Sequence, residues 1–487
     1  MTNFNQLTMA SQHYRYLLDG QWCEPGTGDY EAIRAPYDDS LVGYLPLMTQ
    51  EEAGRAIAGA KKAQPEWAAA PVNERSRILF RAADILEERA TEIGSVLMKE
   101  IAKKRGSAID EVKRTADFIR YTAEEGKRIV GETLHGDSFP GFDRRKVSVV
   151  HRVPLGVVLA ISPFNYPINL AASKIAPALV TGNTVVFKPA TQGAISGLLL
   201  VAAFADAGLP AGVLNTVVGR GSVIGDYLVQ HPDISMITFT GGSVNGARIA
   251  KQAGMIPMVM ELGGKDAAIV LPDADLDVVA KHIVSGAFSY SGQRCTAVKR
   301  ILVMDSIADE LIKRLVPLVE KLSIGNPEEN ADITPLINDS SADYVAGLID
   351  DAVLKGAQLL TGGHRDGRLI HPTLLDAVTV DMRIAWEEPF GPALPILRVS
   401  SEQEAIDIAN ASEYGLQSSI FTKDIEAAFR IANQLEVGTV QINGRTERGP
   451  DHFPFMGVKS SGMGTQGIAY SIQSMTRQKS TVINLSE

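Results

Sequence analysis

The sequence predicts an α/β protein built on a parallel, doubly wound sheet. Between residues 151 and 262, short apolar runs typical of strands alternate with helical segments, and this alternation favours parallel strands with helices on both faces. A second alternating stretch, residues 267–440, provides enough chain for another α/β domain. Two such domains leave a cleft between them, and a doubly wound sheet binds its ligands at the carboxyl ends of its strands.

Each helix of the first stretch follows a strand, as a βα unit requires. The expected strands are Val157–Ile161, Thr184–Phe187, Leu214–Val218, Met236–Thr240 and Met258–Leu262. The expected helices run up to Val180, up to Gly208, over Ser222–Gln230 and over Asn245–Ala253. In the second stretch the helical pattern is clearest over Leu276–Ser285 and Ile307–Leu322.

The flanking segments predict further elements. The run Tyr16–Trp22 predicts a strand, a turn and a return strand in an ordered N-terminal wrap. Thr49 and Glu52 have the spacing of a capping box at the start of a helical region that extends to about residue 125. The segments Lys146–Val150 and Ser480–Leu485 alternate like strands outside any βα unit. Such extra strands often pair across subunits.

The composition is that of a globular protein. The 487 residues correspond to about three units of ~150 residues, and 45% hydrophobic with 21% charged residues excludes a disordered chain or a fibre. The 47 Lys+Arg and 57 Asp+Glu give a net charge of -10, which argues against a nucleic-acid-binding surface. The longest apolar stretch, Gly197–Ala205, is shorter than the ~18 residues of a membrane helix.

Cysteine and histidine usage excludes two further classes of site. Cys23 and Cys295 are too few for a disulfide framework in so long a chain and indicate a reducing compartment, so we expect a cytoplasmic protein. The eight histidines are scattered without a ligand spacing such as H-x-x-x-H, so we expect no metal site.

Cys295 lies in a loop of small residues and follows Arg294 directly. The positive charge of that arginine would favour the thiolate, which is the nucleophilic form of cysteine. The alternative is a buried cysteine that only packs as a small hydrophobic residue. The loop by itself leaves both interpretations open.

Two polar residues end apolar strands of the first stretch. Glu261 closes the strand before Gly263 and Gly264, where apolar surroundings would make it a candidate general base. Its alternative is a carboxylate that caps a helix or pairs with Lys265. Asn165 follows the first strand and could donate its amide to an oxyanion, or it could be an ordinary turn residue.

Two glycine-containing turns, Gly219–Gly225 and Gly241–Gly246, join strands to helices. Neither has the form G-x-G-x-x-G. Both place small residues where backbone N–H groups and a helix N-terminus can approach a pyrophosphate, but loose glycine loops of this kind are common.

Several motifs occur in one order along the chain. They are Phe164-Asn165, Phe187-Lys188-Pro189-Ala190, Phe239-Thr240-Gly241, Glu261-Leu262-Gly263-Gly264-Lys265, Gly292-Gln293-Arg294-Cys295 and Glu388-Pro389-Phe390-Gly391-Pro392. Together they resemble the aldehyde dehydrogenase superfamily, and the resemblance extends from about Tyr16 to the end of the chain. The glutamate and cysteine motifs are specific to that superfamily.

The resemblance implies a Rossmann-type cofactor domain, an α/β catalytic domain and a small β oligomerisation arm. The cofactor domain would comprise residues 1–128 and 152–262, and the catalytic domain residues 263–465. Residues 129–151 and 466–487 would form the arm of a homotetramer, a dimer of dimers.

The resemblance also implies the catalytic roles. Cys295 would attack the aldehyde, and Asn165 with the backbone N–H of Cys295 would stabilise the resulting oxyanion. A hydride would pass to the nicotinamide, and Glu261 would activate the water that hydrolyses the thioester. The presence of Glu261 favours water over coenzyme A as the acyl acceptor. A binding protein on this fold would be expected to lose Cys295 or Glu261, and both are present.

For the cofactor, the resemblance implies that Lys188 and Glu388 hold the two riboses and that Phe390 borders the nicotinamide. The pyrophosphate would lie at three residues of the glycine turns, Gly221, Gly242 and Ser243. Many NAD-preferring relatives have a glutamate where Thr191 stands. Thr191 removes that negative charge, so we predict a preference for NADP, with NAD as the alternative.

Three segments and one helix look like the non-phosphorylating glyceraldehyde-3-phosphate dehydrogenases. They are Gly292–Arg300, Thr446–Val458, Ala160–Asn169 and Glu111–Ala116. By this likeness the substrate phosphate would be bound by Arg114, Tyr166, Arg294 and Arg448. The alternative is that each arginine is a solvated surface charge, and for Arg114, which lies off the apolar stripe of its helix, the residues alone favour that alternative.

The predicted reaction is oxidation of D-glyceraldehyde 3-phosphate to 3-phosphoglycerate with reduction of NADP and without inorganic phosphate. Arg445, Glu447 and His452 depart from the pattern of this subfamily near the expected phosphate site. These departures leave room for another small anionic aldehyde such as succinate semialdehyde, sulfolactaldehyde or phosphonoacetaldehyde.

Overall fold

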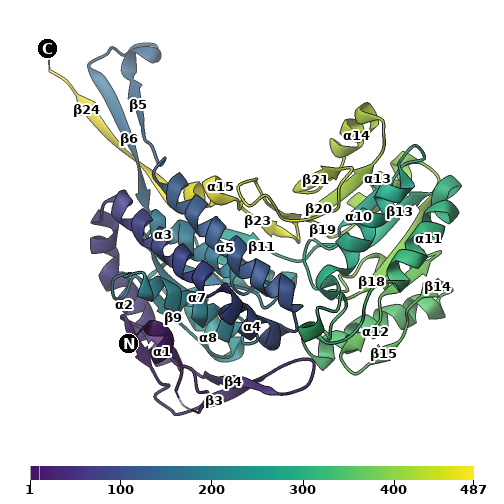
Figure 1. The fold of residues 1–487 in the computed structure, drawn as a ribbon. Coiled ribbons are helices and arrows are strands. Elements are labelled where there is room, and N and C mark those ends of the chain that lie inside the picture. The colour runs from purple at the N-terminus through teal and green to yellow at the C-terminus, as the bar shows by residue number, and fades with distance from the viewer. Residues whose placement is uncertain (1, 10, 487) are drawn as a thin grey trace.

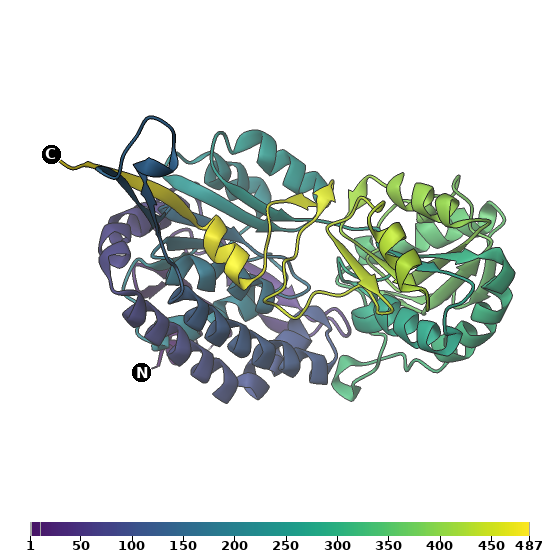
Figure 2. The ribbon, with the colours of Figure 1, turned by 90° about the horizontal axis from the view of Figure 1, so that it is seen from above.

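The computed structural model describes residues 2–9 and 11–486. Two α/β lobes lie side by side, and a narrow three-stranded sheet projects from the lobe that contains the N-terminus (Figure 1). Seen from above, the C-terminal part of the chain runs from the second lobe back across the first (Figure 2). The two alternating stretches therefore form separate sheets, one in each lobe.

The N-terminal segment wraps the first lobe, as predicted. Its elements are α1 (Asn3–Leu7), β1 (Tyr16–Leu18), β2 (Gln21–Cys23), β3 (Tyr30–Arg34) and β4 (Leu41–Pro46). β1 and β2 pair antiparallel, which confirms the predicted strand, turn and return strand. The backbone N–H of Leu17 donates to Oγ1 of Thr216 at 2.7 Å and ties this hairpin to the first sheet.

Four helices follow the wrap, namely α2 (Gln50–Ala69), α3 (Val72–Glu88), α4 (Ala90–Ile101) and α5 (Arg105–Gly126). The capping box at Thr49 and Glu52 is present at the start of α2. The apolar stripe predicted for α5 consists of Ile109, Val112, Ala116 and Ile119, of which the last three are buried and Ile109 is half-buried.

The first sheet has six strands. In spatial order they are β23 (Gly462–Met463), β11 (Met258–Glu261), β10 (Ile234–Thr240), β7 (Val157–Ile161), β8 (Thr184–Lys188) and β9 (Leu214–Thr216). β7 to β11 run parallel, and β23 returns antiparallel beside β11. The helices that cross over are α6 (Asn169–Val180), α7 (Ala194–Asp206), α8 (Gly221–Gln230) and α9 (Ser243–Gln252). The predicted doubly wound sheet is confirmed, with element ends that differ by a few residues.

The second sheet has seven strands. In spatial order they are β14 (Gln358–Thr361), β17 (Thr373–Asp376), β18 (Ala393–Val399), β13 (Arg300–Met304), β12 (Ala267–Val270), β20 (Gln417–Phe421) and β21 (Thr439–Ile442). Its helices are α10 (Leu276–Phe288), α11 (Asp305–Glu320), α12 (Asp339–Leu354), α13 (Glu402–Asn410) and α14 (Ile425–Ala432). Four of these helices begin at a residue whose side chain accepts backbone N–H bonds, namely Asp275, Asn338, Ser401 and Asp424.

The projecting sheet consists of β5 (Glu132–His135), β6 (Lys146–Pro154) and β24 (Thr476–Asn484), with β6 in the middle. β24 pairs antiparallel with β6 along its whole length. The two extra strands thus pair with each other within one chain, whereas the sequence suggested pairing across subunits. Short elements complete the fold: η1 (Gly136–Ser138), η2 (Ser289–Gly292), η3 (Pro327–Glu329), η4 (Arg383–Ala385), β15 (Arg365–Asp366), β16 (Leu369–Ile370), β19 (Tyr414–Gly415), β22 (Val458–Lys459) and α15 (Ile468–Ser474).

Candidate active site

Cys295 lies in the loop that joins η2 to β13. The loop turns sharply, because Tyr290 and Ser291 both adopt φ of 51° and Gly292 adopts φ of 72°. A Cβ atom on Gly292 would lie 2.3 Å from the carbonyl oxygen of Gly391, so only glycine fits at this position. This close contact fixes the loop that carries the cysteine against the segment that carries Phe390.

Two cavities meet at Cys295. One, of about 430 Å³, lies against the first sheet and is lined by residues that include Phe164, Asn165, Gly242, Cys295, Glu388 and Phe390. The other, of about 230 Å³, is lined by residues that include Arg114, Tyr166, Glu261, Arg294, Cys295 and Arg448. The first contains predicted cofactor residues, and the second contains all four predicted substrate residues.

Cys295 and Glu261 are in contact. The thiol Sγ lies 3.4 Å from Oε1 of Glu261. Burial, with a further contribution from Glu261, raises the pKa of the Cys295 thiol well above its usual value. The prediction that Arg294 favours the thiolate is therefore wrong for this structure, since that guanidinium donates to the backbone carbonyl of Gly286 instead.

Glu261 is buried and has three hydrogen-bond donors. Nη1 of Arg448 lies 2.7 Å from Oε2, the hydroxyl of Thr240 donates to the same oxygen at 3.3 Å, and the Cys295 thiol faces Oε1. Nζ of Lys174 donates to Thr240 Oγ1 at 2.6 Å. Burial lowers the pKa of Lys174 to about 7, although the charge of Glu261 opposes this change. The alternative partner, Lys265, makes no side-chain hydrogen bond to any described residue.

Asn165 is held rigidly beside the cysteine loop. Its amide Nδ2 donates to the carbonyl of Gln293 at 3.0 Å, and its own carbonyl accepts a bond of 2.8 Å from Nζ of Lys103. Lys103 forms a buried ion pair with Glu111 and lies 3.5 Å from the ring centroid of Tyr166. One buried cation thus positions both Asn165 and Tyr166.

Two predicted cofactor residues lie at or beside the cavity of about 430 Å³: Gly242 lines it, and Lys188 pairs across the sheet with the lining residue Ile161. The Lys188 side chain is buried, and the one hydrogen bond that its Nζ makes to a described residue is a 3.4 Å contact to the carbonyl of Pro189; burial lowers the pKa of Lys188 to about 8. A Cβ atom on Gly242, at the N-terminus of α9, would meet open space. These features leave donors and room for an anionic ligand, so the predicted cofactor residues fit NADP.

Other predicted cofactor residues already have protein partners. Glu388 forms a 3.0 Å ion pair with Lys299 and accepts a bond from Gly264 N, and Ser243 Oγ donates to the carbonyl of Ser460 at 2.8 Å. The ring of Phe390 packs edge-on against Phe164. Gly221 begins α8 but does not line the cavity, and Thr191 likewise lies outside the lining.

The predicted phosphate residues come from distant parts of the chain. Arg114 on α5 makes a bidentate ion pair with Asp451, at 2.8 and 2.9 Å, and donates to the carbonyl of Arg448. Arg114 is therefore not an unpaired surface charge. Arg294 is 7% exposed and forms no ion pair with any described carboxylate, and its Nε lacks a hydrogen-bond partner. Of the three predicted phosphate-binding arginines, Arg294 is thus the one with a buried side-chain donor that has no partner among the described residues.

The three departures noted in the sequence lie in different places. Arg445 and Glu447 line the same cavity as Arg114 and pair with each other at 2.8 Å. His452 does not line this cavity, and its ring stacks on Tyr121 instead. Only the first two departures can therefore touch the substrate.

Sequence reasoning missed three charged residues of this site, and each left a signal. Lys174 is the single charged residue of helix α6, whose residues are all buried. Lys299, four residues after Cys295, donates to the carbonyl of Cys295 and pairs with Glu388. Asp451 lies three residues after Arg448, within the segment Thr446–Val458 that contains this predicted phosphate-binding arginine.

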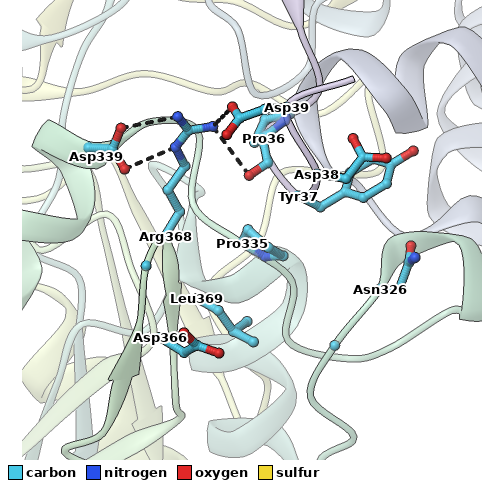
Figure 3. A pocket seen from close by; sticks show the side chains of 12 residues that line it. Pro36, Tyr37, Asp38, Asp39, Asn326, Pro335, Asp339, Asp366, Arg368 and Leu369 are labelled. Carbon is cyan, nitrogen blue, oxygen red and sulfur yellow. Dashed lines mark hydrogen bonds and ion pairs between the residues drawn. The ribbon is translucent and has the colours of Figure 1, made fainter. Parts of the chain in front are cut away.

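A wider cavity of about 580 Å³ lies away from these residues, between the turn that joins β3 to β4 and the second lobe. There Arg368 binds Asp339 at 3.0 Å and Asp39 at 2.8 Å (Figure 3). None of the predicted site residues lines it. The contact fastens the N-terminal wrap to the second lobe.

Among the described residues, none of the helices combines the length and the apolar character needed to cross a membrane. The family model described as "Aldehyde dehydrogenase family" matches residues 22–481. The NADP-dependent glyceraldehyde-3-phosphate dehydrogenase of Streptococcus equinus is 57% identical over 98% of this chain and 100% of its own length. The 3-sulfolactaldehyde dehydrogenase of Priestia aryabhattai is 38% identical over 98% of this chain and 99% of its own length.

This chain is also similar to solved structures of aldehyde-oxidising enzymes. A crystal structure of NADP-dependent glyceraldehyde-3-phosphate dehydrogenase from Bacillus halodurans C-125, complexed with NADP, superposes with a TM-score of 0.97. It is 60% identical and covers 97% of this chain and 100% of that chain.

Proposed function

Since the chain belongs to the aldehyde dehydrogenase family, we propose that it oxidises D-glyceraldehyde 3-phosphate to 3-phosphoglycerate with reduction of NADP and without inorganic phosphate. The observation that carries this proposal is the cavity lined jointly by Cys295, Arg114, Arg294 and Arg448. An aldehyde beside the thiol would have cationic groups within the same cavity for its phosphate. The curated relatives named NADP-dependent glyceraldehyde-3-phosphate dehydrogenase are 51–57% identical, whereas the sulfolactaldehyde enzyme is 38% identical.

The acylation step begins at the thiol. Cys295 loses its proton, and its sulfur forms a bond to the aldehyde carbon, which gives a tetrahedral oxyanion. The amide of Asn165 and the backbone N–H of Cys295 stabilise this oxyanion. NADP, when bound, would supply the nicotinamide that accepts the hydride from the aldehyde carbon, and the carbonyl then re-forms as a thioester to the sulfur of Cys295.

The deacylation step belongs to Glu261. The carboxylate lines the cavity of about 230 Å³ together with Cys295 and is not part of the lining of the cavity of about 430 Å³. It accepts a proton from water while the water oxygen bonds to the thioester carbon, and the thiolate of Cys295 leaves. The product is the free carboxylate, so no acyl phosphate is formed.

The cofactor assignments rest on the cavity of about 430 Å³. Lys188 and Glu388 would hold the riboses, Phe390 would border the nicotinamide, and Gly242 and Ser243 would lie at the pyrophosphate. Thr191 adds no negative charge near Lys188, which leaves a 2′-phosphate without electrostatic repulsion. Of the predicted cofactor residues, Gly242, Glu388 and Phe390 line this cavity, whereas Lys188, Thr191, Gly221 and Ser243 lie outside its lining, so the cavity supports the first three most directly.

We propose the domain division and assembly together. Residues 1–128 with 152–262 form the cofactor-binding domain, residues 263–465 form the catalytic domain, and residues 129–151 and 466–487 form the oligomerisation segment that joins copies of the chain in a dimer of dimers. The exposed side chains of Phe139 and Phe142 at the end of the projecting sheet support this role. The two unpaired cysteines agree with a cytoplasmic location.

The experiment that tests the function is NADP reduction by the purified protein with D-glyceraldehyde 3-phosphate in a buffer free of inorganic phosphate. We expect one 3-phosphoglycerate for each NADPH. The variant Cys295→Ala, folded as judged by its melting temperature, should produce neither. A strict requirement for inorganic phosphate would contradict the proposal.

A further inference from the structure

Arg448 and Glu261 bind each other, although the proposed function gives each of them a different task. Nη1 of Arg448 lies 2.7 Å from Oε2 of Glu261, and the two side chains are 12% and 2% exposed. The guanidinium would bind the anionic group of the substrate, whereas the carboxylate would accept a proton from water. A carboxylate that is paired with a guanidinium is a poorer proton acceptor than a free one.

The other hydrogen-bond donors to Glu261 would not be drawn away by an anionic substrate. The Cys295 thiol faces Oε1, but its proton is gone once the thioester has formed. Thr240 donates to Oε2 at 3.3 Å and in turn accepts from the buried Lys174. Of the charged groups around Glu261, Arg448 is thus the one that also lines the substrate cavity and touches the carboxylate directly.

The guanidinium of Arg448 has room to take another anion as its partner. Its nearest second carboxylate is Asp451, with Nε of Arg448 3.9 Å from Oδ1, and that carboxylate is already held by Arg114. Tyr166 and Arg294 line the same cavity and would hold the anion from other sides. An anion in this cavity would compete for Arg448 and also repel Glu261, and both effects weaken the ion pair.

We propose that Arg448 holds Glu261 in a resting state, and that the anionic group of the substrate draws Arg448 away and so restores Glu261 as the base. This inference rests on the proposed function, because it needs an anionic aldehyde. The phosphate of the substrate would thereby increase the rate of hydrolysis as well as the affinity. Binding energy from a group remote from the reacting carbon is then used in the chemical step.

The step affected is hydrolysis of the acyl-enzyme. A water oxygen forms a bond to the thioester carbon, and one proton of that water moves to the carboxylate of Glu261. The carbon–sulfur bond breaks, and its electron pair leaves on the sulfur of Cys295. An uncharged aldehyde can form the acyl-enzyme, but it does not break the ion pair between Arg448 and Glu261. Its acyl-enzyme is therefore hydrolysed slowly.

The test compares D-glyceraldehyde with D-glyceraldehyde 3-phosphate in the variants Arg448→Met and Arg448→Lys. Hydrolysis of the acyl-enzyme is measured in a single turnover by rapid quench. For D-glyceraldehyde, Arg448→Met should hydrolyse its acyl-enzyme about threefold or more faster than the unaltered protein. For the phosphorylated aldehyde, kcat/KM should fall about tenfold or more. Arg448→Lys retains a cation and should hydrolyse the uncharged acyl group more slowly than Arg448→Met does.

Arg445→Met is the matched control, because Arg445 lines the same cavity but pairs with Glu447 rather than with Glu261. It should not accelerate hydrolysis of the uncharged acyl group. Hydrolysis in Arg448→Met that is no faster than in the unaltered protein, at an unchanged melting temperature, would overturn the inference and leave the proposed function intact. Equal kcat/KM for the two aldehydes in the unaltered protein would instead overturn the proposed function.

Discussion

The thiol of Cys295 lies 3.4 Å from a carboxylate oxygen of Glu261, at the point where the two cavities meet. Because burial raises the pKa of this thiol well above its usual value, the resting cysteine is protonated at neutral pH. Its proton must leave before the sulfur can attack. Glu261 is the nearest carboxylate to receive it, and the same residue is placed to activate water later.

The variant Glu261→Gln should separate the two half-reactions. The amide cannot accept a proton from water, so the acyl-enzyme should accumulate. We expect a burst of NADPH of up to one per active site, slower than in the unaltered protein because the thiol loses the carboxylate that receives its proton, followed by steady turnover that is about a hundredfold slower or more. Stopped-flow absorbance of NADPH measures both phases. Steady turnover equal to that of the unaltered protein would show that another group is the base.

Arg294 should contribute more to phosphate binding than Arg114 does. Nε of Arg294 is buried without a partner, whereas the guanidinium of Arg114 is already neutralised by Asp451. We expect Arg294→Met to raise KM for D-glyceraldehyde 3-phosphate about tenfold more than Arg114→Met does. Neither change should alter KM for D-glyceraldehyde, which serves as the control. The opposite order of the two variants would argue against this assignment.

Thr191 should determine the choice between NADP and NAD. In Thr191→Glu, a carboxylate would repel a 2′-phosphate near Lys188 and could instead bond to ribose hydroxyls. We expect kcat/KM for NADP to fall about tenfold or more, while that for NAD is retained or rises. Thr191→Gln, which has the same shape without the charge, is the control. An equal loss with both cofactors would indicate damage rather than a change of preference.

Asp266 should make stability depend on pH. Its carboxyl is buried beside β12, with Oδ1 bonded to Gln417 N and Oδ2 without a partner among the described residues. Burial raises its pKa to about 7, although Lys299 opposes this change. The folded state therefore holds a proton that the unfolded state releases near pH 4, so this stabilisation is fully present below about pH 4 and is lost as the pH rises through 7.

The variant Asp266→Asn cannot titrate and should not lose stability in this way. Relative to the unaltered protein, its free energy of unfolding should be about 2 kcal/mol more favourable at pH 8 than at pH 5. Urea denaturation at the two pH values measures this difference. An equal effect of the substitution at both values would contradict the assignment to Asp266.

The fold was predictable because its signals are local. Apolar runs such as Val157–Ile161 become the strands of the first sheet, and the Thr49 cap begins its helix where the pattern indicated. The order of short motifs along the chain, which is also a local signal, identified Cys295 and Glu261 as candidate catalytic residues. Their contact joins residues 34 positions apart, and only the resemblance indicated it.

The ion pairs of the site were not predictable, because each one joins distant segments. Arg448 pairs with Glu261 across 187 residues, and Arg114 pairs with Asp451 across 337. From the sequence, these arginines were predicted to bind the substrate phosphate. Their ion pairs with carboxylates of the same chain were not predicted. The prediction that Arg294 favours the thiolate of Cys295 was also wrong, because burial raises the pKa of the thiol.

The most direct test of the central claim is a comparison of kcat/KM for NADP reduction with three aldehydes. These are D-glyceraldehyde 3-phosphate, succinate semialdehyde and D-glyceraldehyde, assayed in the same phosphate-free buffer. If the arginine-lined cavity beside Cys295 selects a phosphorylated aldehyde, kcat/KM for D-glyceraldehyde 3-phosphate should exceed that for each of the others by about a hundredfold or more. Equal values for D-glyceraldehyde 3-phosphate and D-glyceraldehyde would contradict the claim.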